Sequence, residues 1–330
     1  MIGKKDGEDF SLSAYRNGIV LLGSSGGGKS TLTTTFMEAL VATKHQFCIL
    51  DPEGDYTDFP NAVVIGDSAH VPVVDEVIAF LDNPGQNAIV CLLGIPIEKR
   101  PYFFSEFISR VSDLKNKTGH PHWLIIDESN HVLPVEMEKS IFSLPDNLKN
   151  TLFISTEANN INQSVFKYID TVISMGDEPA QVLTDFAKIK EISNDFSSVH
   201  ALPKGKVWVW EISQSAPFVI ETKKPEHLIK RHIGKYATGD MDYNAFLFKG
   251  PENKLNLKAN NVLLFVQMAE VVDDETWNFH LKRHDYSKWF ADSLHDEELA
   301  RLSKEIENGQ SDAATSKDKV LAYIKATYTD

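Results

Sequence analysis

Cysteine is scarce in this sequence, and long apolar runs are absent. Two cysteines in 330 residues argue against a scaffold of paired disulfides. Because Cys48 and Cys91 each lie in an apolar, strand-like run, we expect both to be reduced thiols in the core. No apolar stretch approaches the roughly 20 residues that a membrane-spanning helix needs, and residues 1–10 are polar, unlike a signal peptide. We therefore expect a soluble, cytoplasmic protein without a membrane partner.

Positive charge is also in short supply. The chain has 33 Lys and Arg residues against 47 Asp and Glu residues, for a formal net charge of −14, and neither half is basic. A surface coated with positive charge for nucleic acid is therefore disfavoured, although a local basic groove can coexist with an acidic exterior. Only six residues are arginine. This scarcity argues against a small-molecule kinase, which needs a basic lid over its acceptor.

The order of the expected elements predicts an α/β fold. Strand-like and helix-like segments alternate from residue 18 to about residue 221, as in a mostly parallel sheet covered by helices on both faces. We expect the last two strands to pair antiparallel at the edge of this sheet. The expected strands are 18–22, 46–50, 62–65, 87–93, 122–126, 150–155, 171–175, 206–213 and 217–221. The expected helices are 29–43, 71–82 and 101–116.

The composition changes after residue 221, and we place a domain boundary near residue 222. From residue 260 onward the pattern is helical, with Asp273 at a position typical of a helix N-cap. Further helices are expected near 285–294, 296–307 and 312–327. The sequence thus predicts a large domain over residues 1–222 and a small, mainly helical domain over residues 223–330.

The most informative stretch is GSSGGGKS at residues 23–30, which has the G-x-x-x-x-G-K-S spacing of a phosphate-binding loop. Its glycines can turn backbone N–H groups toward phosphate oxygens. Lys29 brings a charged donor to the β- and γ-phosphates, and the Ser30 hydroxyl can take one position on Mg²⁺. An apolar strand before the loop and a helix after it suit an anion site, whereas a glycine-rich surface turn is the weaker alternative. The predicted nucleotide-binding residues are Gly23, Ser24, Ser25, Gly26, Gly27, Gly28, Lys29, Ser30 and Thr31.

A second candidate element is the apolar strand 122–126, which ends in Asp127 and Glu128. Asp127 can hold Mg²⁺ directly or through water, and Glu128 can orient and deprotonate a water for attack on the γ-phosphate. Such a pair on its own commonly marks only a solvated strand end. The functional interpretation therefore depends on the loop at residues 23–30.

Two further strand ends carry polar residues. The stretch DPEGDY at residues 51–56 follows an expected strand, and by itself it is ordinary turn chemistry. Thr156 and Glu157 follow the strand 150–155. A polar residue there can sense the γ-phosphate from the neighbouring strand, and a plain exit from strand to loop is equally consistent.

Taken in order, these four motifs resemble the HerA/FtsK-like P-loop ATPases, the branch with an additional strand and a catalytic glutamate. DPEGDY resembles the family's D-P-x-G-E-Y turn, DESNH at residues 127–131 approximates its D-E-A-H, and Ser155 with Thr156 matches its S-T-Q. The resemblance covers about residues 15–220. It implies a P-loop NTPase fold of the RecA/HerA type that hydrolyses ATP with Mg²⁺. Lys29 and Ser30 would lie at the phosphates, Asp127 at the metal, Glu128 would be the base, and Thr156 and Glu157 the sensor.

The sequence departs from the family pattern in three respects. Glu157 stands where a glutamine is usual, and a γ-phosphate would repel an acid there. HerA-like hexamers are expected to use arginines from a neighbouring subunit, yet this chain has none between Arg110 and Arg231. The remaining candidates are Arg16, Arg100, Arg110 and Arg231. Because only about 17 residues precede the first expected strand, we also expect the N-terminal barrel of HerA-like motors to be absent.

Two functions remain open on this basis. The first is ATP hydrolysis by a ring of subunits, coupled to remodelling or translocation of DNA or RNA. The second is a slow nucleotide-dependent switch whose helical tail, residues 223–330, docks a partner protein without translocation. The acidic charge and the scarce arginines favour the second function.

The expected helical domain has two segments rich in cations and aromatic residues, 231–236 and 280–289. They could bind an anionic ligand or a nucleic-acid backbone. The alternative is that the aromatic residues are core and the cations lie at its rim. His280 and His284 have the i, i+4 spacing of two metal ligands on a helix, although no cysteine or third histidine accompanies them at ligand spacing. The expected core residues are Trp277, Leu281, Tyr286, Trp289 and Phe290.

Overall fold

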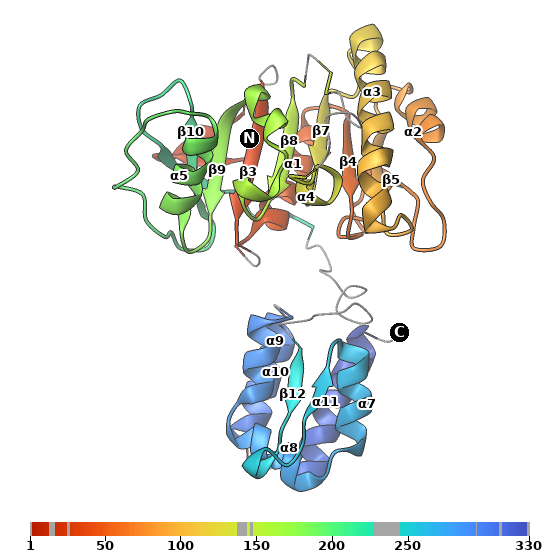
Figure 1. Ribbon diagram of the computed structural model, residues 1–330, viewed down its shortest axis with the longest axis vertical. Helices are drawn as coiled ribbons and strands as arrows, with labels where there is room; N and C mark the ends of the chain where they lie inside the picture. The colour runs from red at the N-terminus through yellow and green to blue at the C-terminus, as the bar shows by residue number, and fades with distance from the viewer. Residues whose placement is uncertain are drawn as a thin grey trace. The chain divides into compact units, whose positions relative to one another are not determined.

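The computed structural model describes two compact units, which correspond to Met1–Lys230 and Arg231–Asp330 (Figure 1). It describes residues 2–12, 17–24, 27–136, 144–145, 148–227, 245–294, 296–309 and 312–328. Each unit has its own buried apolar core. The assignment of separate functions to residues 1–222 and 223–330 stays a prediction.

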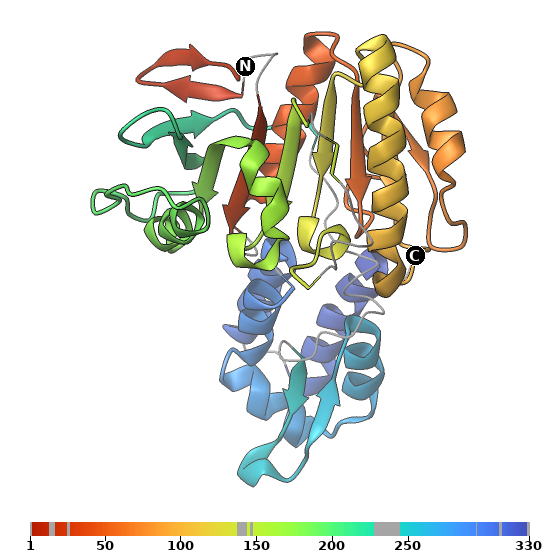
Figure 2. The ribbon, with the colours of Figure 1, turned by 45° about the horizontal axis from the view of Figure 1, so that its top comes forward.

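The first unit is built on an 11-stranded sheet in the order β2-β1-β11-β10-β9-β3-β8-β7-β4-β6-β5 (Figure 2). The strands from β9 to β5 in this order are parallel to one another. They are β3 (Gly18–Gly23), β4 (Phe47–Asp51), β5 (Ala62–Ile65), β6 (Asn87–Cys91), β7 (Trp123–Ile126), β8 (Thr151–Ser155) and β9 (Ile169–Met175). Their bounds agree closely with the expected ones because these strands are near-continuous apolar runs, all of them buried or nearly so except the partly exposed edge strand β5.

The strand β8 lies between β3 and β7. In this register Leu21 of β3 is opposite Ile154 of β8, and Leu152 of β8 is opposite Ile125 of β7. The strand that leads into the glycine loop is therefore separated by one strand from the strand that ends in Asp127. This insertion is the additional strand that the resemblance implied, and it confirms the predicted fold class.

The remaining four strands of the sheet are antiparallel, and they correct one expectation. The strands β10 (Lys206–Glu211) and β11 (Phe218–Thr222) pair antiparallel as predicted. They do not form the edge, because an N-terminal hairpin of β1 (Gly3–Lys5) and β2 (Glu8–Phe10) adds to β11. Its turn has Asp6 at φ 51° and Gly7 at φ 87°. An Asp-Gly pair favours this positive-φ hairpin turn.

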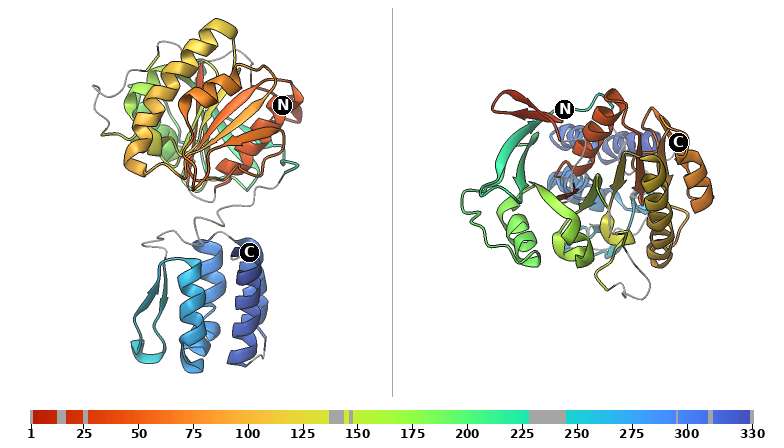
Figure 3. Two further views of the ribbon diagram at one scale, coloured as in Figure 1. Left: turned by 90° about the vertical axis from the view of Figure 1, so that its right-hand side faces the viewer. Right: turned by 90° about the horizontal axis from the view of Figure 1, so that it is seen from above.

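Helices cover both faces of the sheet (Figure 3). On one face, Ile19 and Leu21 of β3 pack in one core cluster with Phe36 of α1. On the other, Val20 and Leu22 belong to a cluster with residues of α2, α3 and α5. The alternation follows from the period of two along a strand. The helices are α1 (Lys29–Ala42), α2 (Val74–Leu81), α3 (Arg100–Thr118), α4 (Ser129–Val132) and α5 (Pro179–Ile189), with 3-10 turns η1 (Ile97–Lys99), η2 (Ala158–Asn160) and η3 (Gln163–Tyr168).

The described part of the second unit packs five helices and a short hairpin around an aromatic core. The expected core residues Trp277, Leu281, Tyr286, Trp289 and Phe290 are all buried, and Asp273 caps its helix by accepting a hydrogen bond from the Thr276 amide. The hairpin of β12 (Phe246–Phe248) and β13 (Leu257–Ala259) was not expected. The helices are α7 (Val262–Val271), α8 (Asp274–Lys282), α9 (Asp285–Asp292), α10 (Glu297–Glu307) and α11 (Ala313–Tyr328), with the 3-10 turn η5 (Pro251–Asn253).

Both cysteines lie in the core of the first unit, as predicted. Cys48 on β4 and Cys91 on β6 are buried and do not form a disulfide. Burial raises the pKa of each thiol, so both are protonated near neutral pH. In the described part of the chain, no helix is long and apolar enough to cross a membrane.

Candidate functional site

The glycine loop connects the end of β3 to the start of α1. Gly28, directly before α1, has φ 101°, a conformation that side chains other than glycine rarely adopt. Among the described residues, no side chain caps the N-terminus of α1 and its first turn has no acid. The start of α1 is thus not occupied by a side-chain cap or an acid, which suits an anion site. The predicted residues Ser25 and Gly26 lie outside the described part of the chain.

Lys29 folds back over this loop. Its Nζ donates hydrogen bonds to the backbone oxygens of Gly23, at 2.8 Å, and Ser24, at 3.2 Å. Only 6% of Lys29 is exposed. The ammonium group therefore lies inside the loop, where carbonyl groups compensate for part of its lost hydration. Ser30 and Thr31 follow in the first turn of α1, and Ser30 is half-buried while Thr31 is exposed.

The ends of two neighbouring strands hold the loop in place. The Gly23 amide donates to the Thr156 backbone oxygen, just after β8, at 3.2 Å. A Cβ at Gly23 would lie 2.4 Å from the backbone oxygen of Met175 on β9. A Cβ at Gly176, the next residue, would lie 2.6 Å from the Ser24 Oγ. The sequence analysis missed Gly176, although a glycine directly after an apolar strand was the available signal.

Asp127 and Glu128 lie at the end of β7. Asp127 is only 4% exposed. Burial raises its pKa well above the usual value, and the charges of Glu128, Asp55 and Asp51 add to this increase. The carboxyl group thus lies in a buried, strongly negative environment, which favours either a proton or a cation.

Glu128 has an unusual backbone conformation. Its φ of 37° and ψ of 57° are left-handed, and it directly precedes the short helix α4. This conformation costs a residue with a side chain roughly 1–2 kcal/mol. Strain of this kind is often found at functional sites, where the surrounding structure maintains it.

Ser129 supplies part of that surrounding structure. Its fully buried hydroxyl donates to the Ile126 backbone oxygen at 2.9 Å and accepts from the Ile154 amide at 3.1 Å. It therefore joins the end of β7 to β8. In the same short helix, the Nδ1 atom of His131 is 3.2 Å from the Nη1 atom of Arg100.

The arginine candidates have different surroundings. Arg100 is 7% exposed, and its Nε also donates to the Ile95 backbone oxygen at 3.0 Å. Both contacts lie within the same chain. Arg110 on α3 forms an exposed ion pair with Asp75 of α2 at 2.7 Å. Arg16 and Arg231 lie outside the described residues.

The acidic turn after β4 lies close to the β7 pair. The two carboxylate oxygens of Asp51 accept hydrogen bonds from the amides of Asp55, at 3.0 Å, and Tyr56, at 2.9 Å. Burial, followed by the charge of Asp55, raises the pKa of Asp51 to about 7. Tyr56 is fully buried, and its pKa is raised by burial and then by the charge of Asp127. The structure thus brings DPEGDY into the electrostatic environment of Asp127.

The two predicted sensor residues differ in their surroundings. Thr156 is half-buried, and its hydroxyl accepts a hydrogen bond from the Asn160 amide group at 3.4 Å. Its backbone oxygen is the one that contacts Gly23. The Glu157 side chain is exposed. Their roles in catalysis stay predictions.

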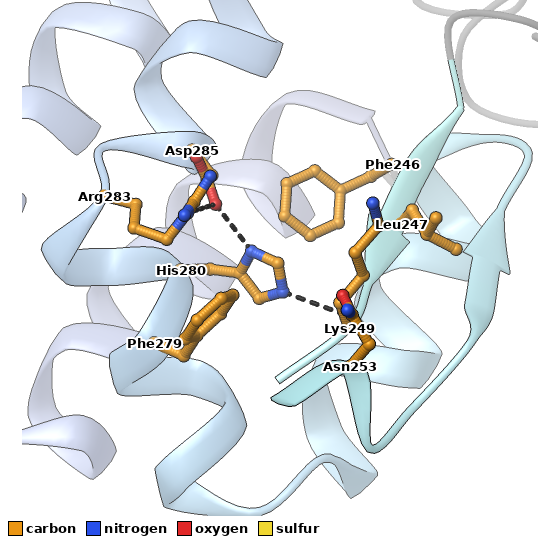
Figure 4. A pocket seen from close by; sticks show the side chains of 8 residues that line it. All are labelled: Phe246, Leu247, Lys249, Asn253, Phe279, His280, Arg283 and Asp285. Carbon is orange, nitrogen blue, oxygen red and sulfur yellow. Dashed lines mark hydrogen bonds and ion pairs between the residues drawn. The ribbon is translucent and has the colours of Figure 1, made fainter. Parts of the chain in front are cut away.

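In the second unit, the spacing of two histidines does not produce a metal site. The helix α8 ends at Lys282, and His284 has φ 57° before α9, so His280 and His284 do not share one helix. The Nδ1 atom of His280 is 2.8 Å from Asp285 Oδ2, while its Nε2 accepts from the Lys249 amide at 3.1 Å (Figure 4). The described residues contain no group of three or more metal-ligating side chains. The segment 231–236 lies outside them.

A profile of the family described as "Helicase HerA, central domain" matches residues 16–198. The matched region is more than half of the chain, and it includes the glycine loop, the DPEGDY turn, the Asp127–Glu128 pair and the Ser155–Thr156 segment. No match was found among curated proteins.

Several solved structures resemble the chain at low sequence identity. The genome packaging NTPase B204 from Sulfolobus turreted icosahedral virus 2, in complex with ATP-gammaS, is 13% identical, with a TM-score of 0.45 over 65% of this chain and 100% of that one. The type VII secretion ATPase EccC from Thermomonospora curvata is 16% identical, with a TM-score of 0.39 over 68% and 28%. The pCW3 conjugation coupling protein TcpA with ATPgS is 12% identical, with a TM-score of 0.38 over 67% and 65%.

Proposed function

The chain belongs to the HerA helicase central-domain family, and from this we infer that it is a Mg²⁺-dependent ATPase whose nucleotide binds at the loop of residues 23–30. The observation that carries this proposal is the buried Lys29 ammonium, held inside the loop by the Gly23 and Ser24 carbonyl groups. It lies at the N-terminus of a helix without an acid in its first turn. A positive charge at the N-terminal end of a helix dipole favours a polyphosphate.

The loop residues would bind the phosphates. The Lys29 ammonium would exchange its two carbonyl partners for β- and γ-phosphate oxygens, which are stronger acceptors because they are charged. The backbone amides of the loop and of Thr31 would donate to the remaining phosphate oxygens. The ends of β8 and β9 would support the described residues of this loop, through the Gly23 contact with Thr156 and the close approach of Gly176 to Ser24.

The residues present fit a divalent cation. Asp127 is a buried carboxyl in a negative environment, as its raised pKa indicates, and Ser30 offers a hydroxyl in the first turn of α1. These two residues would hold Mg²⁺, which accepts only one or two protein ligands and takes its others from water and phosphates. When bound, the ion would neutralise negative charge on the β- and γ-phosphates.

Glu128 would orient the attacking water and accept its proton. Its strained backbone, held by the neighbouring Ser129, would fix the direction of the carboxylate. We propose that the Thr156 hydroxyl contacts the γ-phosphate region from the neighbouring strand. Glu157 is exposed, so a role for it would need the carboxylate to turn toward the nucleotide with a cation nearby.

Two versions of this proposal differ in what ATP hydrolysis is coupled to. The family favours coupling to DNA or RNA by a ring of subunits in the cytoplasm. The alternative is a slow switch whose residues 223–330 dock a partner protein. ATPase rate with and without DNA, together with particle size in ATP, distinguishes them. Stimulation by DNA in a multimer supports the first version, and a monomer that DNA does not affect supports the second.

The matched test of the chemistry is Glu128→Gln. This change keeps the shape of the side chain and removes the base, so we expect ATP hydrolysis to fall by at least about 100-fold. ATP affinity, measured by titration calorimetry, should stay within about threefold of the parent. Normal turnover by this variant would refute the role of Glu128, and loss of ATP binding would show a structural role instead.

A further inference from the structure

The second unit has a groove between α9 and α10 that the proposed ATPase does not use. Its volume is about 620 Å³. The polar side chains that line it all offer hydrogen-bond donors, and they come from both helices. They are His284, Ser287, Lys288, Arg301, Lys304 and Asn308.

The charge of this groove is opposite to that of its surroundings. Residues 231–330 contain 13 basic and 17 acidic side chains, yet the lining residues that the structure describes include no acid. Such a concentration of cations on an acidic unit is a local feature with its own electrostatic field.

Two nearby acids are already engaged. The Glu307 carboxylate, whose side chain is fully buried, contacts His284 Nδ1 at 3.2 Å and accepts from the Ser287 amide at 3.0 Å. Glu305 pairs with Arg301 at 2.6 Å, but both side chains are more than 60% exposed. An exposed pair of this kind is worth little and is easily exchanged for a stronger anion. The groove thus retains Lys288, Arg301 and Lys304 as cations for a ligand.

The side chains that line the groove, and their spacing, favour phosphates over an acidic protein. Of the lining residues that the structure describes, only Ala291 and Ala300 are apolar, whereas a protein partner usually buries large apolar or aromatic anchors. Arg301 and Lys304 on α10, and Asn308 directly after it, follow one face over about 10 Å. One strand of a duplex presents a phosphate about every 3.4 Å along its axis, so this length matches about three phosphates.

We propose that the α9–α10 groove binds the phosphodiester backbone of a nucleic acid. The site lies outside residues 16–198, which match the family, and it needs neither bound ATP nor hydrolysis. It would give the chain a contact with nucleic acid that is independent of the nucleotide site. The described lining contains no Phe, Tyr or Trp on which a base could stack, so the contact would not distinguish base sequence.

The test uses the full chain without ATP and a fluorescent 20-nucleotide single strand, with a duplex of the same length in parallel. Three phosphate contacts predict a slope of about −2 for log affinity against log salt on the single strand. The affinity of the parent protein should therefore fall about 10- to 20-fold between 50 and 200 mM salt. The triple variant Lys288→Ala, Arg301→Ala, Lys304→Ala should bind at least about tenfold more weakly at 50 mM, with a slope close to zero.

A matched control removes the same charge from elsewhere in the unit. Lys258, Lys282 and Lys319 are exposed, and their replacement by alanine should change affinity by less than about threefold. The exchange Lys288→Arg, Arg301→Lys, Lys304→Arg should retain binding. Circular dichroism checks that each variant is folded.

The proposal is overturned if the parent protein does not bind either oligonucleotide at 50 mM salt, or if both triple variants bind equally well. It is also overturned if polyglutamate, at the same concentration of charge, displaces the oligonucleotide, because the groove would then suit an acidic protein. Failure of the ATPase proposal would leave all these measurements unchanged.

Discussion

Gly176 gives a sharp test of how the phosphate-binding loop is held. It follows β9 with φ 97°, and a Cβ at this position would lie 2.6 Å from Ser24 Oγ and 3.3 Å from the Ser24 backbone nitrogen. In Gly176→Ala the Ser24 hydroxyl must rotate away from the new methyl group. The backbone amide of Ser24 must also move by a few tenths of an ångström. That amide is one of the donors that we expect to face the phosphates.

The cost of this change has two parts. The positive φ costs alanine roughly 1–2 kcal/mol wherever it occurs. The close contact with Ser24 adds about 1 kcal/mol, the low end for overpacking, because part of it is relieved by rotation of a small side chain. The first part lowers the stability of the fold. The second part destabilises the ATP-binding conformation of the loop, because the Ser24 amide is displaced. We expect this to weaken ATP binding about 5- to 10-fold.

Gly205→Ala is the matched control. Gly205 has φ 90°, and a Cβ there would have no neighbour within 4 Å. Thermal unfolding should show similar losses of stability for the two variants, whereas titration with ATP should show weaker binding for Gly176→Ala alone. If Gly176→Ala binds ATP as tightly as the parent, the end of β9 does not shape the loop, and the reasoning is wrong.

Two further predictions concern stability. Ser129→Ala leaves the buried Ile154 amide without the hydroxyl that accepts its hydrogen bond at 3.1 Å. We expect the free energy of unfolding to fall by about 1–3 kcal/mol, which would lower the melting temperature by roughly 3–10 °C. An unchanged melting temperature would contradict this. Burial lowers the pKa of His280 below 6.5, against the opposing effect of Asp285, so the unfolded chain binds the proton more readily and stability should be lost as pH falls below about 6.5. Denaturant unfolding at pH 7.5 and 5.5 measures this loss, and His280→Gln, which stays neutral, should reduce it; an equal pH dependence in both proteins would refute the role of His280.

Most of the parallel sheet could be predicted from the sequence because each strand is a short apolar run between polar loops. The strand β5, for example, has the expected bounds of 62–65. The hairpin β1–β2 was missed because strands of three residues carry too little alternation to be recognised. The Asp6-Gly7 turn was its only local signal. Missing it placed β11 at the edge of the sheet.

The candidate site was predictable as a set of motifs but not as an arrangement. The spacing of Gly23, Gly28 and Lys29 is a local property, so the sequence reveals it directly. Contacts between distant segments, such as Gly176 with Ser24 or Arg100 with His131, depend on strand order and have no local pattern. The i, i+4 spacing of His280 and His284 would place both on one helix face only if the helix continued across residue 283, and α8 ends at Lys282.

ATP binding by Lys29→Ala tests the central claim most directly. The alanine variant removes the ammonium that the loop surrounds and leaves its backbone in place. Calorimetric titration of the folded variant with Mg²⁺-ATP should show no measurable binding under conditions where the parent protein saturates. Tight binding of ATP by Lys29→Ala would show that the nucleotide site lies elsewhere in the chain.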